Sequence, residues 1–283
     1  MSRIAIVTDS SAYMHPEFIE DHNIRVVPLK VHWGEETLRD GVDITASEFY
    51  ERLGKSADIP TTSQPSRQEF IQVFEELAPH CDGIIVPLIS SGISGTVDSA
   101  LSAQSEFSAV PVGIVDSYST AAGLALVVIA VSQAVDAGKS FAEIKQIAVN
   151  GARNVQLFFM VDTLEYLHKG GRIGGASRFF GSALSIKPIL YLDDRGKIDA
   201  LERVRTKQKA LSRLIELAAN TAADRPARVG ILHADAYNLA VAFRKHIKEN
   251  IDCLQLDIYE LSPVIGTHVG PGSIGVAILP EVE

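Results

Sequence analysis

Cysteine is scarce in this sequence. The 283 residues include two cysteines, Cys81 and Cys253, which lie far apart in the chain. Two thiols form at most one bridge, so no disulfide framework holds the fold together, and this usage is typical of a reducing cytosol. The eight histidines include no His-x-x-x-His pair and the cysteines no Cys-x-x-Cys, the spacings of common metal sites. We therefore expect a cytoplasmic protein without a metal or other cofactor.

The sequence also has few positively charged residues and no long apolar run. It contains 26 Lys and Arg and 35 Asp and Glu, which gives a net charge of −9. Nucleic acids and anionic membranes are bound by clustered Lys and Arg, so this balance argues against a broad footprint on either. The longest apolar stretch, residues 121–131, has 11 residues, well below the ~18 that a membrane-spanning helix needs. We expect no nucleic-acid partner and no stable membrane insertion.

Strand and helix patterns alternate in the first half of the chain. Hydrophobic residues make up 46% of the sequence, enough for a full core. Apolar runs at residues 4–7, 84–89 and 110–115 predict strands, and their alternation with helical patterns predicts an α/β fold with a largely parallel sheet. Helix starts are marked by capping boxes, in which a Ser or Thr is followed three residues later by Glu. These pairs are Thr45 with Glu48, Ser66 with Glu69, and Ser140 with Glu143.

The pattern changes in the second half. A strand at 155–161, a glycine-rich turn at 170–175 and a hairpin around 193–196 come first. Helical stretches then alternate with strands: helices at 207–220 and 236–248, strands at 227–232, 253–259 and 274–279. We predict two α/β domains, residues 1–153 and 154–283, with a ligand cleft between or beside them, because small ligands usually bind at such junctions.

A turn rich in Ser and Gly, residues 90–96 (SSGISGT), follows the strand predicted at 84–89 and precedes a helical pattern. Free N–H groups and the positive end of a helix dipole make such a turn an anion site, although a tight turn with a helix cap explains the same residues equally well. A P-loop would need a Lys before the closing Ser or Thr, and none is there. The turn also misses the Gly-x-Ser-x-Gly nucleophile elbow by one glycine. An acyl-ester hydrolase with Ser94 as nucleophile and His268 as base therefore stays open as an alternative.

Further polar segments have weaker signals. Residues 61–66 (TTSQPS) precede a capped helix, which indicates a loop and a cap, but with Ser94 they offer converging hydroxyl donors. Residues 167–174 place basic side chains in a glycine-rich turn. His268 lies among glycines that would let a ligand approach, yet a lone histidine is usually structural. Residues 270–275 match Gly-x-Gly-x-x-Gly, but a strand-like run follows instead of a helix, so the dinucleotide fingerprint fails.

Taken together in order, these segments resemble the DegV family over nearly the whole chain. The resemblance rests on residues 8–11 (TDSS), 62–66 (TSQPS), 90–96 (SSGISGT), 164–167 (LEYL) with 170–173 (GGRI), 187–190 (KPIL) and 266–272 (GTHVGPG). It implies a two-domain α/β protein that binds one long-chain fatty acid between its domains, as the fatty-acid-binding subunit of bacterial fatty acid kinase. In such a system a separate ATP-dependent kinase phosphorylates the bound acid, and the acyl phosphate feeds phospholipid synthesis.

The same resemblance assigns roles to residues. Thr62, Ser63 and Ser94 would hold the carboxylate through hydroxyls, the backbone of Gly95 would help, and His268 would lie close to the head group. The pocket mouth would carry two arginines that serve the phosphate or contact the kinase, Arg172 and Arg205. The protein itself would be a lipid carrier and not an enzyme. A regulatory lipid sensor, whose surface changes when ligand binds, is the non-enzymatic alternative.

Overall fold

The computed structural model describes residues 3–56, 58–181 and 186–281. Its first sheet is parallel throughout, as the sequence predicted. In spatial order its strands are β2 (Arg25–Val27), β1 (Ile4–Asp9), β6 (Gly83–Leu88) and β7 (Val112–Asp116). Every residue of β6 is buried, because a central strand of a parallel sheet is covered by helices on both faces.

A second sheet is mixed and draws its strands from the later part of the chain. In spatial order they are β10 (Ile198–Val204), β9 (Lys187–Leu192), β8 (Gln156–Met160), β13 (Ile274–Pro280), β11 (Ala227–His233) and β12 (Cys253–Glu260). Among these described strands, β11 and β12 are parallel and the other neighbours are antiparallel. The predicted hairpin is confirmed as β9 and β10, which Asp193 closes by accepting the N–H of Lys197 at 2.8 Å.

A third sheet did not emerge from the sequence. It contains β4 (Glu36–Arg39), β3 (Lys30–Trp33) and β5 (Thr61–Ser63), all antiparallel. These strands are three or four residues long and half-polar, so the alternating pattern that identifies a strand is too short to be recognised. The residues of β5 were predicted from the sequence to be a loop before a helix cap, and this prediction was wrong.

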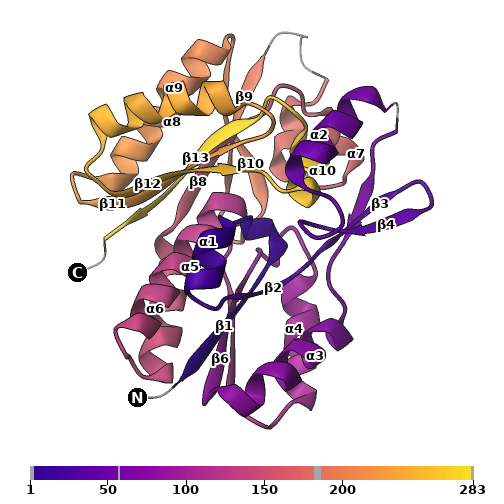
Figure 1. Cartoon of the computed structure of the whole chain (residues 1–283). Coiled ribbons are helices and arrows are strands. Elements are labelled where there is room, and N and C mark those ends of the chain that lie inside the picture. Colours follow the sequence, from indigo (N-terminus) through magenta and orange to yellow (C-terminus); the bar gives the residue numbers. More distant parts are fainter. Residues whose placement is uncertain (1–2, 57, 182–185, 282–283) are drawn as a thin grey trace.

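The helices form layers that separate and cover the two large sheets (Figure 1). The outer layers are α3 (Arg67–Leu77) with α4 (Thr96–Glu106), and α8 (Lys207–Ala222) with α9 (Tyr237–Asn250). Between the sheets lie α5 (Ala121–Asp136) and α6 (Phe141–Asn154), which contact strands of both. Because α5 is covered on both sides, it is apolar almost all round. The longest apolar run of the sequence, residues 121–131, therefore lies in the core that the two large sheets share.

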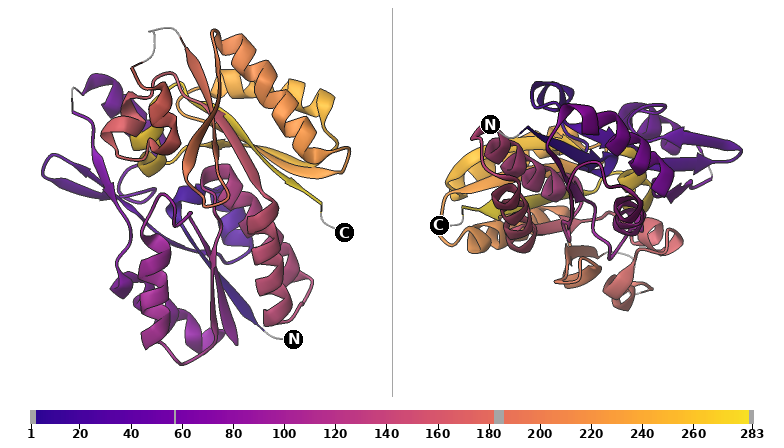
Figure 2. Two further views of the ribbon diagram at one scale, coloured as in Figure 1. Left: turned by 180° about the vertical axis from the view of Figure 1, so that it is seen from behind. Right: turned by 90° about the horizontal axis from the view of Figure 1, so that it is seen from below.

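The remaining helices are short, apart from α2. They are α1 (Pro16–Asp21), α2 (Ala46–Lys55), α7 (Glu165–Lys169) and α10 (Pro263–Val269), with 3-10 turns at Ser10–Ala12, Ala78–His80 and Gly174–Phe179. Helix α10 packs against α2, α7 and strands of the third sheet. Viewed from behind, the β9–β10 hairpin reaches toward the turn before α4 (Figure 2). All three predicted capping boxes are present.

No helix in the described ranges is both long enough and apolar enough to cross a membrane. The strands of the parallel sheet lie between residues 4 and 116, and those of the six-stranded sheet between 156 and 280. The division at residue 153 falls at the end of α6, whose layer packs against both sheets. The division of the chain into two domains, residues 1–153 and 154–283, remains a prediction.

Candidate functional site

A cavity lies where the three sheets meet. Its wall includes Ile89, which follows β6, Thr62 on β5 and Leu157 on β8, so each sheet contributes. A hollow is therefore present between the sheets, where the sequence predicted a ligand cleft.

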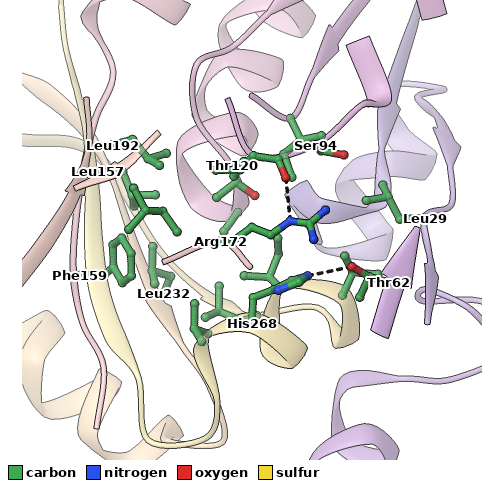
Figure 3. A pocket seen from close by; sticks show the side chains of 18 of the residues that line it. Leu29, Thr62, Ser94, Thr120, Leu157, Phe159, Arg172, Leu192, Leu232 and His268 are labelled. Atoms are coloured by element: carbon green, nitrogen blue, oxygen red, sulfur yellow. Dashed lines mark hydrogen bonds between the residues drawn. The ribbon is translucent and has the colours of Figure 1, made fainter. Parts of the chain in front are cut away.

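The cavity wall is polar toward one end and hydrocarbon toward the other (Figure 3). The polar lining consists of Thr62, Ser63, Gln64, Ser94, Thr120, Arg172 and His268. At the other end the view shows Leu157, Phe159 and Leu192. Leu157 and Phe159 reach the same wall because alternate residues of β8 point to the same face of the sheet. Such a wall suits a long ligand with one polar end.

Thr62 and His268 meet across 206 positions of sequence, with Thr62 Oγ1 and His268 Nε2 2.8 Å apart. Strand β5 holds Thr62 in register with Val31 of β3, and α10 carries His268 near its end. The neighbouring Ser63 hydroxyl is 2.8 Å from Nε2 of His32. A ring nitrogen that donates to Thr62 leaves the threonine proton free for an acceptor on a ligand.

His268 is held in its neutral form. Burial, with a smaller contribution from the positive charge of Arg172, lowers the pKa of the imidazole to about 4. Its Nδ1 is buried without a hydrogen-bond partner in the part of the chain that the structure describes. Gly170 lies against this nitrogen so closely that a Cβ there would be 2.2 Å away. At neutral pH His268 therefore offers a hydrogen bond and no charge.

The predicted Ser-Gly turn does join a strand to a helix, since β6 precedes it and α4 follows. Gly95 is the N-cap of α4 and has no side chain to accept the first free N–H groups of the helix. The Ser94 hydroxyl lies 2.9 Å from that of Thr96 and lines the cavity. Gly95, which the resemblance also assigned to the head group, is not among the residues that line the cavity, and a Cβ on it would be 3.0 Å from Nε2 of Gln64. The helix start and the hydroxyl together favour an anion.

A contact with the β9–β10 hairpin supports this turn. The Ser90 hydroxyl donates to the carbonyl of Gly196 at 2.8 Å and accepts the N–H of Gly92 at 3.0 Å. A Cβ on Gly92 would be 2.5 Å from the carbonyl oxygen of Arg195. The sequence had indicated only a solvated hairpin turn here, because nothing local shows which distant segment covers it.

Arg172 brings a positive charge into the cavity. Its Nε donates to the carbonyl of Ile93 at 3.2 Å and its Nη1 to that of Gly170 at 2.9 Å. These carbonyls orient the guanidinium without neutralising it, and no carboxylate in the described ranges forms an ion pair with it. Arg205, the second arginine proposed from the resemblance, is exposed after β10 and is not part of the cavity wall.

A second hollow adjoins the polar end from outside. It shares Thr62, Arg172 and His268 with the inner cavity. Its own wall adds Asp58, Ile59, Pro60, Thr61, Lys169 and Gly170. Since these two spaces meet at the same three side chains, the polar end lies at the mouth and the hydrocarbon end lies inside.

The geometry lacks the contacts of a serine hydrolase. Ser94 pairs with Thr96, and His268 pairs with Thr62, so no bond joins the proposed nucleophile to the proposed base. No described residue orients His268 through Nδ1, whereas a catalytic histidine needs such a partner. Across the described ranges, no three His, Cys, Asp or Glu side chains gather as metal ligands do.

A buried carboxylate that sequence analysis missed supports α10. Asp40 is 1% exposed and accepts the Ser10 hydroxyl at 2.7 Å and the N–H of Val264, at the start of α10, at 3.3 Å. Burial is the main cause that raises the pKa of Asp40 to about 7, and the nearby carboxylate of Asp9 adds to it. No local pattern marks Asp40, because its partners come from segments far away in sequence.

The Asp40→Asn variant is expected to gain stability relative to the wild type as the pH rises. Asp40 has its ordinary pKa of 3.8 when unfolded and about 7 when folded, so the folded state holds the extra proton between these values. The wild type therefore loses up to about 4 kcal/mol from pH 4 to pH 8 through this group. The lowered pKa of His268 makes stability rise with pH instead, but both proteins contain His268, so its contribution cancels in the comparison. Urea denaturation of both at several pH values measures the difference, and a constant difference would contradict the assignment.

A family model and a relative of known sequence both match this chain over nearly its whole length. The family model described as "Uncharacterised protein, DegV family" matches residues 3–281. A DegV domain-containing protein of Streptomyces coelicolor is 38% identical over 281 residues, which cover 98% of this chain and 99% of that protein.

Solved structures agree along the full length. A DegV family protein from Thermus thermophilus, described by its fatty acid binding, has a TM-score of 0.93 at 32% identity and covers 99% of this chain and 100% of its own. DegV from Bacillus subtilis, described as a fatty acid binding protein, has a TM-score of 0.91 at 34% identity with the same coverage.

Proposed function

Because this chain belongs to the DegV family, we propose that it is a carrier that binds one long-chain fatty acid in the cavity between its sheets. Structures of family members bind fatty acids. The observation that carries the proposal for this chain is the division of one cavity into a hydrocarbon interior and a mouth with hydroxyls, a neutral imidazole and a guanidinium that forms no ion pair within the described ranges.

The carboxylate would be held at the mouth. Taking an ionised carboxylate out of water costs several kcal/mol unless it is hydrogen-bonded, and a helix N-terminus alone returns at most ~2 kcal/mol. Thr62, Ser94 and the start of α4 behind Gly95 would supply neutral donors, His268 would fix the Thr62 hydroxyl, and Arg172 would supply the charge. Ser63 lies beside them on β5.

The alkyl chain would supply most of the affinity. About fifteen buried methylenes at ~0.8 kcal/mol each give roughly 12 kcal/mol, against an association cost of about 4 to 15 kcal/mol. Binding is favourable when that cost is at the low end, which requires most of the wall to be ordered before the ligand enters.

The acid bound in this way would be presented to a separate ATP-dependent kinase. A carboxylate oxygen would attack the γ-phosphorus of ATP, the bond to the ADP oxygen would break, and the acyl phosphate would remain in the carrier for phospholipid synthesis. The shared mouth of the two hollows supports this role, because it puts the head group next to the surface. Arg172 would lie beside the new phosphate, and the exposed Arg205 would be a contact for the kinase.

Native mass spectrometry tests the carrier function. The purified protein is expected to carry one molecule of fatty-acid mass, and the delipidated protein is expected to rebind stearate in a ratio of one to one. Separation of the released lipid by chromatography identifies the natural chain. If neither the purified nor the reloaded protein shows an adduct, the proposed function is wrong.

A further inference from the structure

A buried hydroxyl interrupts the cavity away from the mouth. Thr120 is 8% exposed and lines the cavity, and its Oγ1 is buried without a hydrogen-bond partner anywhere in the described ranges. Figure 3 shows Thr120 between Ser94 and the leucines 157 and 192, within the cavity. Buried hydroxyls are almost always paired, because an unpaired one destabilises the fold. An orphan on a ligand wall therefore calls for a partner on the ligand.

The local backbone keeps this hydroxyl out of its usual role. Thr120 is the N-cap of α5, where a threonine side chain normally accepts an N–H of the first helical turn, yet here it makes no such bond. Its backbone carbonyl instead accepts the N–H of Gly123 at 2.9 Å. The next residue, Ala121, is in the left-handed region with φ 48°, a conformation that costs energy for any side-chain-bearing residue. The chain thus keeps a strained turn at a cavity-lining position.

The surroundings indicate what the partner is. Figure 3 shows Ser94 and Arg172 on one side of Thr120 and Leu157 and Leu192 on the other, so the hydroxyl lies where the polar end of the cavity meets the hydrocarbon end. The proposed function places the carboxylate between Thr62 and Ser94, and we take the group that meets Thr120, on the side of the leucines, to belong to the alkyl chain. A chain hydroxyl can donate to and accept from Oγ1, while the π electrons of a double bond form only a weak contact.

On the basis of the proposed function, we infer that the ligand is a fatty acid with a hydroxyl group partway along its chain and that Thr120 recognises this hydroxyl. One hydrogen bond between neutral groups corresponds to a preference of about fivefold to tenfold. The preference depends on which carbon of the chain carries the hydroxyl, because the mouth fixes the position of the carboxylate and the wall fixes the position of Thr120. One positional isomer is therefore selected over the others.

Competition between stearate and a series of hydroxystearates for the delipidated protein tests this inference. One isomer is expected to bind the wild type about fivefold to tenfold more tightly than stearate. Thr120→Val, which has nearly the same shape without the hydroxyl, is expected to remove the preference, so that the isomer and stearate bind this variant equally. Thr120→Ser is expected to restore it. Ser119→Ala is the matched control, because Ser119 also has a buried unpaired hydroxyl but does not line this cavity.

The outcomes separate the two proposals. If stearate binds but no isomer is preferred, or if the preference survives in Thr120→Val, the inference about Thr120 is wrong and the carrier function stands. If the wild type prefers oleate and no hydroxystearate, and if Thr120→Val removes that preference, the inference about Thr120 is also wrong. If neither stearate nor any isomer binds the wild type, the proposed function fails and this inference with it. Thermal melting and stearate binding of Thr120→Val show whether that variant is folded.

Discussion

The Leu157→Trp variant is expected to bind stearate more than 100-fold more weakly than the wild type. Leu157 is 4% exposed on β8, and its side chain forms the hydrocarbon wall of the cavity (Figure 3). An indole at this position would occupy space that the alkyl chain needs. If it excludes about four methylenes, the loss is about 3 kcal/mol at ~0.8 kcal/mol each, a factor of more than 100.

Chain length gives this prediction its specificity. An eight-carbon acid has a much shorter chain to place in the hydrocarbon end, so Leu157→Trp is expected to weaken octanoate binding less than stearate binding. Leu157→Met conserves volume and is expected to leave stearate affinity within a few-fold. Isothermal titration of the delipidated proteins with both acids provides the comparison. Equal stearate affinity in the tryptophan variant would show that the chain lies elsewhere.

The Arg172→Met variant is expected to weaken stearate binding by about 2 to 4 kcal/mol. Two backbone carbonyls orient the guanidinium toward the mouth, where it is the charged group next to His268. Removing one partner of a buried, hydrogen-bonded charge pair costs about this much, because the other charge is left unpaired. The expected loss is about 30-fold or more.

A neutral ligand separates charge from shape in this experiment. Stearyl alcohol has the same chain and no negative charge, so it is expected to bind Arg172→Met and the wild type nearly equally. Arg205→Met is the matched control, because Arg205 is exposed and outside the cavity wall. The substitution at Arg172 also removes a charge that lowers the pKa of His268, so this pKa is expected to rise in an NMR titration. Unchanged stearate affinity would remove Arg172 from the head-group site.

Local chemistry explains which elements the sequence predicted well. A capping box needs only a hydroxyl and a carboxylate three residues apart, so the helix starts at Thr45, Ser66 and Ser140 follow from neighbouring residues alone. The strands that the sequence analysis predicted with bounds agree with β1, β6, β7, β8, β11, β12 and β13 to within two residues at each end, whereas β9 and β10 were predicted only as a hairpin around residues 193–196. The third sheet was missed because its strands are too short to show a period.

Contacts between distant segments decided the site. The hydrogen bond between Thr62 and His268 joins residues 206 positions apart, and only the packing of α10 against the third sheet brings them together. The resemblance pointed to these residues, but the distance between them, the neutral state of the imidazole and the backbone carbonyls that hold the Arg172 guanidinium became known only from the structure. Asp40 and Thr120 had no local signal at all, since an unusual proton affinity or an unpaired hydroxyl exists only after burial.

By itself the sequence determined the α/β class, the helix starts, the absence of a disulfide framework and the family, because these depend on composition, on neighbours within a few residues and on the order of motifs. Only the tertiary structure decided that α5 is covered by two sheets at once, that the polar residues meet at one mouth, and which face of β8 lines the cavity. The physical reason is that burial is a property of the whole packed chain: it removes water from chosen side chains, and this removal creates the hydrocarbon cavity and its polar mouth.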